Sequence, residues 1–378
     1  MPRLRRVGLA TALAAVPVAL AYRFALVYRG RAGFPARVAP RRSPGELGLA
    51  FEETVVRSAA GALPAWFIPA RGGLAGPGVA LVHGWESARD RLLPHILFLN
   101  AAGFHCLTFD VRGHGANPAE ALPISGGEFQ ADALAALDAL LARPEVTGGA
   151  LFGHSMGGVG AILAAADDPR CGALVSCSAP ADPRHLTRQT FRLAHLPIPD
   201  PIAVPLAWLT ARVYVRPRGH SVHAITASRA IARYGGPILV VHGAVDTVVP
   251  PGDLDRLVRA ARRGRSRIAN PQPVESLLLP GGRHSWLYED ERFRRTVAAF
   301  LARSLGGPYS PEEAAERAGQ TFCVRPPEGE APFDALVDLP APVRLMTGMA
   351  AGARSASAAA PASGVVGGSL PSHRGGSA

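Results

Sequence analysis

Lysine is absent from this sequence of 378 residues, so all 40 basic residues are arginines. Cysteine is scarce: the four cysteines lack CxxC spacing, which excludes a disulfide-stabilised scaffold and a zinc site of that type. Only the N-terminus has a long apolar run, and a multi-span membrane protein is therefore excluded. Hydrophobic residues make up 48% of the chain and recur in ordered blocks, which favours a folded domain over disorder as the main state.

Acidic residues are missing from the first 45 positions, and this explains the formal net charge of +11. Nine arginines lie in residues 1–42, whereas the rest of the chain carries 31 arginines against 29 acids. A nucleic-acid-binding protein more often carries its basic surface on the folded domain, with aromatic residues interspersed. We therefore expect no nucleic-acid partner.

Residues 1–45 are expected to form a signal or anchor segment and a linker. Arginines open the segment, an uncharged run covers residues 7–22, and a second apolar patch covers residues 24–28. The combined stretch reaches the roughly 20 residues of a spanning helix only if Arg23 extends its guanidinium to the headgroups. This predicts membrane anchoring by a single N-terminal helix. The alternative is secretion after signal cleavage, because residues 19–21 (A-L-A) match the small-residue cleavage pattern.

Residues 46–305 alternate short apolar runs with amphipathic stretches, which predicts an α/β fold with a mostly parallel central sheet and helices on both faces. The apolar runs cover residues 78–82, 105–109, 150–152, 173–176, 238–241 and 276–279. Two earlier runs, at residues 52–57 and 63–68, alternate apolar and polar side chains and predict an antiparallel edge.

Three further segments interrupt or follow this alternation. Residues 180–235, roughly, are proline-rich and too apolar for a plain linker, and they predict a helical cap insertion. Residues 306–346 form a proline-rich C-terminal extension with a short helical signal at 311–318. Residues 347–378 are a low-complexity tail of small residues, which is expected to be disordered.

The sequence G-H-S-M-G at residues 153–157 lies between a predicted strand and a helix-like run. This is the setting of a nucleophile elbow, in which a serine stands on a tight turn flanked by glycines. The following helix directs its first N–H groups toward negative charge that develops beside the serine. Ser155 is therefore the candidate nucleophile.

Two later loops provide an acid and a base. Asp246 follows the buried run 238–241, and His284 lies in a glycine loop after the run 276–279. Because the carboxyl ends of parallel strands meet at one edge of a sheet, Ser155, Asp246 and His284 are expected to converge there. Serine needs a base to take its proton, and the histidine needs a carboxylate to orient it. Asp182, after an earlier strand, is the alternative acid.

The sequence H-G-W at residues 83–85 follows another predicted strand. We expect the backbone N–H groups of Trp85 and Met156 to form an oxyanion hole, in which each donor contributes roughly 2.7–4 kcal/mol to lowering the barrier. Four other histidines (His83, His114, His154 and His242) are expected to hold loops by hydrogen bonds.

With these motifs in order, residues 50–305 resemble the α/β-hydrolase superfamily, and specifically its serine-nucleophile branch of esterase-, lysophospholipase- and aminopeptidase-like members. The resemblance rests on His83-Gly84, the D-V-R-G-H-G run at 110–115, the elbow, and the Asp246 and His284 loops. It implies the fold, a Ser-His-Asp triad and acyl-transfer chemistry, and it leaves the substrate open.

The sequence thus predicts a serine hydrolase that acts on carboxylic esters or thioesters of a small-molecule acyl substrate. The apolar cap favours a fairly apolar acid. A serine peptidase or aminopeptidase, using Glu86, Arg89 or Asp90 to bind a peptide terminus, is one alternative. A non-catalytic anchored binding module is the other. Neither an organic cofactor nor a metal is expected, and the oligomeric state stays open.

Overall fold

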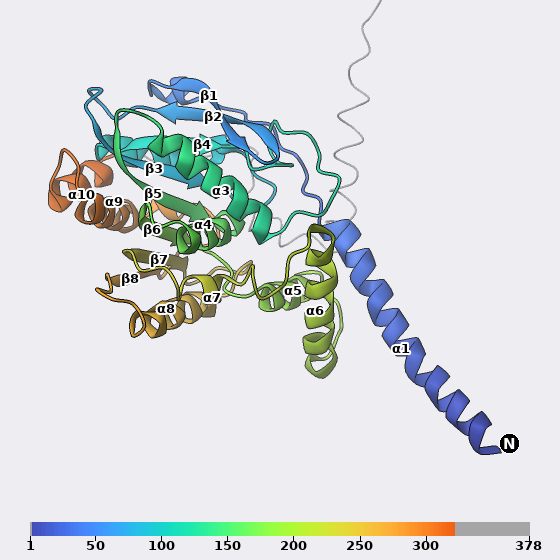
Figure 1. The fold of residues 1–378 in the computed structure, drawn as a ribbon. Helices are drawn as coiled ribbons and strands as arrows, with labels where there is room; N and C mark the ends of the chain where they lie inside the picture. Colours follow the sequence, from blue (N-terminus) through green and yellow to red (C-terminus); the bar gives the residue numbers. More distant parts are fainter. Residues whose placement is uncertain (1, 322–378) are drawn as a thin grey trace, which may run out of the picture.

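The structure, a computed structural model, describes residues 2–321, with side chains from residue 15 onward. Its body is one eight-stranded sheet in the order β1-β2-β4-β3-β5-β6-β7-β8 (Figure 1). The strands are β1 (Glu52–Ser58), β2 (Gly61–Ile68), β3 (Gly76–Val82), β4 (His105–Phe109), β5 (Val146–His154), β6 (Cys171–Cys177), β7 (Ile238–Gly243) and β8 (Val274–Leu279). Strand β2 runs antiparallel to β1 and β4, and the pairs from β4 to β8 are parallel. The mostly parallel sheet and its antiparallel edge are as the sequence predicts.

The apolar runs mark the centres of the strands better than their ends. The run at 150–152 becomes the nine-residue β5, which pairs with β3 and with β6. Glycines 148 and 149 belong to β5 although they carry no apolar side chain. A strand with neighbours on both sides is lengthened by backbone hydrogen bonds to them. The pattern of apolar side chains does not predict these bonds, so it predicts too short a strand.

Helices cover both faces of the sheet, and each face has its own apolar core. One core joins the sheet to α3 (Gly126–Leu141), α4 (Met156–Asp167), α7 (Ala227–Ala230) and α8 (Gly252–Arg265). The other joins it to α2 (Leu93–Ala101), α9 (Glu291–Leu305) and α10 (Pro311–Gly319). Continuous burial of β3, β4 and β7 follows from this two-sided packing.

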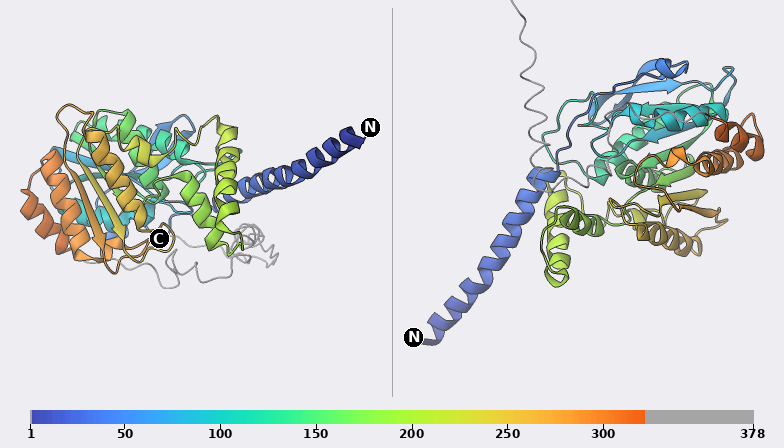
Figure 2. Two further views of the ribbon diagram at one scale, coloured as in Figure 1. Left: turned by 90° about the horizontal axis from the view of Figure 1, so that it is seen from below. Right: turned by 180° about the vertical axis from the view of Figure 1, so that it is seen from behind.

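The N-terminal helix α1 (Pro2–Ala32) projects away from the body and meets it only near its C-terminal end (Figure 2). There Phe24 and Tyr28 pack edge-on against Phe191, and the Tyr28 hydroxyl lies 2.7 Å from Thr190 Oγ1. Within the described part of the chain, no helix has the length and apolarity needed to cross a membrane. The predicted membrane anchor is therefore not supported.

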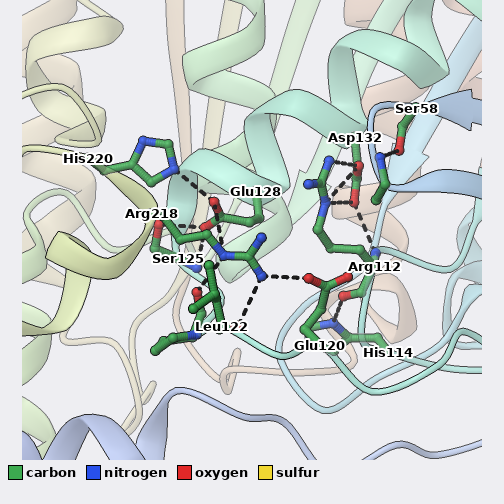
Figure 3. A network of polar contacts seen from close by, with 12 residues as sticks. Ser58, Arg112, His114, Glu120, Leu122, Ser125, Glu128, Asp132, Arg218 and His220 are labelled. Carbon is green, nitrogen blue, oxygen red and sulfur yellow. Dashed lines mark hydrogen bonds and ion pairs between the residues drawn. The ribbon is translucent and has the colours of Figure 1, made fainter.

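Residues 180–235 form α5 (Pro183–Leu193), α6 (Asp200–Val215), the 3₁₀ turn η3 (Arg216–Arg218) and α7. Helices α5 and α6 pack on each other, and α6 lies beside the end of α1 (Figure 1). The chain beyond α6 is fixed to the loop before α3 and to the first turn of α3: Arg218 donates to Glu120 at 2.6 Å, and His220 contacts Glu128 at 2.8 Å (Figure 3).

Helix α10 starts at the proline that the sequence predicts as a helix start. Ser310 and Glu313 form a capping box, with Glu313 accepting from the Ser310 N–H at 2.9 Å and donating its own N–H to the Ser310 hydroxyl. The buried residues Ala314 and Ala318 then join the core beside α9. The rest of the predicted extension, from residue 322, and the tail at 347–378 lie outside the described residues.

Candidate active site

Ser155 lies between β5 and α4 with a left-handed φ of 55°, a strained conformation for a residue with a side chain. Tight packing around the elbow imposes it. A Cβ on Gly153 would lie 2.2 Å from the Gly157 carbonyl oxygen, and one on Gly157 would lie 2.1 Å from the Val82 oxygen. Both flanking positions therefore require glycine, and the turn presents the serine at the end of the strand.

The side chains of Ser155, His284 and Asp246 form one hydrogen-bonded chain. Ser155 Oγ donates to His284 Nε2 at 3.0 Å, and His284 Nδ1 donates to Asp246 Oδ2 at 2.9 Å. The residues follow β5, β8 and β7, whose carboxyl ends meet at one edge of the sheet. His284 and Asp246 are only 3% and 4% exposed, so little water competes for their contact. The structure thus brings together the three residues that the sequence singles out.

Asp246 receives hydrogen bonds from two directions. Its Oδ1 accepts the N–H groups of Val248 and Val249 at 2.9 and 2.8 Å. Its Oδ2 accepts from His284 and lies 3.2 Å from His242 Nε2. Burial by itself raises the pKa of Asp246, but the hydrogen bonds from His242 and His284 outweigh it and hold the pKa well below its ordinary value. The carboxylate is therefore charged and fixed in place.

Asp182, the alternative acid, is engaged elsewhere. It caps the N-terminus of α5 by accepting the Arg184 N–H at 2.8 Å, and it pairs with the Arg184 guanidinium at 2.5 Å. Asp246, and not Asp182, is therefore the carboxylate that contacts His284.

His154, inside the elbow, contacts the loop of the catalytic base. Its Nε2 lies 2.7 Å from the backbone oxygen of His284, and the two rings are 5.0 Å apart. Burial, together with the neighbouring His284, lowers the pKa of His154 to about 4. The ring is neutral at pH 7, so its Nε2 carries the proton and donates it to that carbonyl. This bond ties the serine turn to the histidine loop.

His83 orients the peptide bond that precedes the Trp85 N–H. Burial lowers the pKa of His83 to about 4, so its ring is neutral at pH 7. Its Nε2 accepts the Val111 N–H at 3.0 Å, which leaves Nδ1 to donate to the Gly84 oxygen at 2.8 Å. In a planar trans peptide the C=O and N–H point in opposite directions. Holding the Gly84 carbonyl toward His83 therefore directs the Trp85 N–H away from it.

Of the two predicted oxyanion donors, Trp85 lines the cavity beside Ser155 and His284, whereas Met156 is not among the lining residues. Gly84 also lines this cavity. Met156 is the first residue of α4, where the backbone N–H has no partner within the helix. Assignment of Trp85 and Met156 as oxyanion donors stays a prediction.

The cavity beside Ser155, of about 130 Å³, is walled by parts of the chain that differ from those expected. Its lining comes from the N-terminal segment, the loop after β3, the start of α2, the elbow, the end of β6 and the His284 loop: Arg41, Arg42, Leu47, His83, Gly84, Trp85, Glu86, Ser87, Asp90, Arg91, Leu92, Leu93, Pro94, His95, His154, Ser155, Cys177, His284, Ser285, Trp286, Leu287 and Tyr288. All of them lie outside residues 180–235. The expectation of an apolar acid depended on the cap and loses that support.

Sequence reasoning missed two features of this site. His242 was expected only to hold a loop, yet it touches the triad carboxylate as well as the Val249 oxygen at 2.9 Å. The sequence offered one indication of this contact, because His242 lies only four residues before Asp246. Arg41 and Arg42, which lie in the predicted linker, line the cavity together with Leu47 at the start of the predicted domain. In the part of the chain that the structure describes, no group of three or more His, Cys, Asp or Glu side chains is arranged to hold a metal ion.

The segment that contains the elbow matches a known family model. Residues 77–226 match the family model described as serine aminopeptidase, S33, a segment that includes Ser155 but ends before Asp246 and His284. Two uncharacterized proteins of Mycobacterium tuberculosis, from strains CDC 1551 and H37Rv, are each 28% identical over 225 residues. That alignment covers 59% of this chain and 68% of the relative in both cases.

Solved structures share the architecture at low sequence identity. An esterase of Pyrococcus furiosus superposes with a TM-score of 0.57 at 20% identity, covering 72% of this chain and 98% of the other. An acylaminoacyl peptidase of Pyrococcus horikoshii gives 0.52 at 15% identity, covering 70% and 44%. An α/β hydrolase from a Penicillium species gives 0.51 at 20% identity, covering 68% and 99%. At such identities the likeness shows the fold alone, and it confirms the predicted fold class.

Proposed function

We propose that this chain, which has the α/β-hydrolase fold, is a serine hydrolase of that type and cleaves carboxylic ester or thioester bonds through an acyl-enzyme. The observation that carries the proposal is the continuous hydrogen-bonded chain from Ser155 through His284 to Asp246. The chain lies at a cavity, where an acyl group can reach the serine.

The first half-reaction follows from these contacts. Ser155 Oγ attacks the carbonyl carbon while His284 Nε2 takes its proton, and Asp246 stabilises the imidazolium that forms. The N–H groups of Trp85 and Met156 stabilise the oxyanion of the tetrahedral intermediate. Collapse of the intermediate breaks the ester bond, and His284 returns the proton to the departing alcohol or thiol.

The second half-reaction regenerates the enzyme. Water attacks the acyl carbon and His284 again accepts a proton, so that the acid is released and Ser155 recovers its hydroxyl hydrogen. Every proton transfer in the two half-reactions passes through His284 of the hydrogen-bonded chain.

A serine peptidase is the second candidate, and the match to a model described as serine aminopeptidase favours it. An aminopeptidase needs an acid for the free amino group of its substrate. Glu86 and Asp90 line the cavity, but Glu86 accepts the Ala36 N–H at 3.1 Å and Asp90 accepts the Arg41 N–H at 2.7 Å. Arg89 pairs with buried Asp110. Since the three side chains expected to bind a peptide terminus have these contacts, the ester reaction is preferred.

Labelling with a fluorophosphonate probe, followed by steady-state assays, tests the proposal. The wild-type chain should label and should hydrolyse p-nitrophenyl acyl esters faster than the matched aminoacyl p-nitroanilides. Ser155→Ala should lose labelling and about 10⁶-fold in kcat. Ser266→Ala, an exposed serine after α8, is the control that keeps both.

The outcomes separate the candidates. Faster cleavage of the aminoacyl amides would contradict the proposed esterase activity and support the peptidase activity. Absence of labelling in the folded wild-type chain would overturn catalysis altogether and restore the non-catalytic binding module.

A further inference from the structure

The N-terminal strap, which we define as residues 33–48, is an ordered part of the cavity. Its backbone is fixed at Glu86 and Asp90, which accept the N–H groups of Ala36 and Arg41. Within it, the turn η1 (Pro44–Leu47) is capped by a Ser43–Glu46 box. The strap therefore lies against the loop that carries Trp85, and its last turns face the nucleophile's cavity.

Positive charge is concentrated where the strap meets the loop after β3. Arg41 and Arg42 come from the strap, and Arg91 comes from η2 (Arg89–Leu92). Each guanidinium has five N–H donors, so one arginine side chain can contact protein groups and an anion at the same time. Arg91 and Arg42 are half-buried, which reduces screening by salt relative to a fully exposed pair.

The two acids of the cavity do not offer an equivalent site for a cation. Their carboxylates already accept strap amides, at 3.1 Å for Glu86 and 2.7 Å for Asp90. The three arginines also outnumber them among the lining residues. A substrate ammonium would face a net positive wall, whereas a carboxylate or phosphate would be attracted to it and could accept hydrogen bonds from guanidinium groups.

Apolar side chains complete the lining. Leu47 of the strap, Leu92 and Leu93 at the start of α2, and Trp286 and Leu287 beside the catalytic histidine all face the cavity. An uncharged ligand segment gains by covering such surfaces, at about 25 cal/mol per Å² buried. The lining thus combines an apolar part, next to the reacting serine, with a cationic part.

We propose that the substrate is an ester that carries an anionic group a few atoms from the scissile carbonyl, and that Arg41, Arg42 and Arg91 bind this group. This inference rests on the proposed ester hydrolysis, and it states which esters the site prefers. The strap is then a specificity element, and the apolar surfaces hold the segment that joins the reacting carbonyl to the anion.

Two matched substrate pairs test this and locate the charge. In the first, mono-p-nitrophenyl adipate is compared with its methyl ester, so that the acyl end differs only in charge. In the second, 3-carboxyphenyl hexanoate is compared with its methyl ester, which moves the charge to the alcohol part. Each kcat/KM is divided by the rate constant of alkaline hydrolysis, which removes differences in intrinsic reactivity.

We expect the wild-type chain to prefer the anionic member of one pair by about tenfold, and this preference should shrink as ionic strength rises. Arg91→Gln and the double variant Arg41→Gln/Arg42→Gln should bring the ratio to about one while turnover of the neutral ester stays within about twofold. Retained neutral-ester turnover shows that the variants fold. Arg259→Gln, an exposed arginine of α8, should keep the wild-type ratio.

A ratio at or below one in both pairs, with neutral esters hydrolysed, would overturn the anionic substrate and leave ester hydrolysis standing. Arginine variants that keep the wild-type preference would overturn it equally. Failure of the proposed function has a different signature, because then neither member of either pair is turned over and fluorophosphonate does not label Ser155.

Discussion

The edge of the sheet that carries the triad and the strap that walls its cavity are positioned by different means. At the edge, each catalytic residue follows a strand of the sheet, and backbone contacts exclude any side chain at Gly153 and Gly157. The strap belongs to no strand of the sheet, and loops hold it by hydrogen bonds: Glu86 and Asp90 accept its N–H groups, Asn117 accepts from Arg37, and Ile124 donates to Gly33. Close packing thus holds the proposed catalytic residues, whereas hydrogen bonds hold the proposed selectivity element. Changes at the edge should therefore abolish turnover, and changes at the strap should shift preference.

The sharpest test at the edge compares two aspartates. Asp246→Asn should lower kcat by about 10⁴-fold, because an amide favours the wrong tautomer of His284. Asp182→Asn should leave kcat within about twofold and lower stability by no more than roughly 1 kcal/mol, because asparagine still caps α5. Steady-state kinetics and thermal unfolding of both variants check this. The reverse ranking of the two kcat values would assign the triad acid to Asp182.

His242 tests how far the edge extends beyond the three triad residues. His242→Leu removes a donor to the Asp246 carboxylate and should lower kcat by about 10- to 100-fold, in line with the 1.5–3 kcal/mol of a hydrogen bond to a charged group. The acid limb of the kcat/KM profile should move to higher pH, because the hydrogen bond from His242 helps to lower the pKa of Asp246 and its loss raises that pKa.

A conservative variant distinguishes positioning from packing at this position. His242→Gln places an amide N–H near the position of the lost Nε2 and should recover most of the activity and the wild-type pH profile. If the Gln and Leu variants are equally impaired and neither profile moves, His242 serves only to fill space.

The neutral histidines around the site should make the free energy of unfolding depend on pH in the acid range. Burial lowers the pKa of His83 and His154 to about 4 and of His95 and His114 to about 3, from an ordinary value near 6.5. Below pH 6.5 the unfolded chain binds protons that the folded chain does not bind, so the free energy of unfolding falls between pH 6.5 and about 3. Asp246, with its lowered pKa, adds a loss only below about pH 4.

A variant at buried His95 and a control variant at an exposed histidine test this prediction. Its Nδ1 has no partner in the structure, and its ring packs against Phe152, Tyr288 and Phe293. His95→Phe should remove about 2–3 kcal/mol of the loss at pH 4.5. His185→Phe, at an exposed site on α5, should not. Denaturant unfolding at pH 7 and pH 4.5 measures both, and parallel pH profiles for the wild type and His95→Phe would refute the assignment.

The smallest effect is expected at the strap. Asp90→Ala removes the acceptor of the Arg41 N–H, which water can replace at this half-buried site. We expect KM for the preferred ester to rise about three- to tenfold and kcat to stay within about twofold, with Asp255→Ala on α8 as the control. A loss confined to kcat would show that the strap acts on the chemistry and would remove the contrast between the two regions.

The sequence alone determined the catalytic edge. Ser155, Asp246 and His284 each follow a recognisable apolar run, and parallel strands deliver their carboxyl ends to a common edge, so that convergence could be predicted without coordinates. The choice between Asp246 and Asp182 was different. Both follow buried strands, and only the packing of α5, with Arg184 beside Asp182, separated them.

Only the tertiary structure decided which segments enclose the cavity. Arg41, Arg42 and Leu47 line the cavity with Ser155, and the strap donates backbone N–H groups to Glu86 and Asp90; such bonds between side chains and backbone leave no periodicity in a sequence. The helices at 183–215 looked like a cover for the site because they are apolar, yet they pack beside α1. Turns such as the elbow are encoded in contiguous residues, whereas the order of the strands and the contacts between distant loops depend on how the whole chain packs.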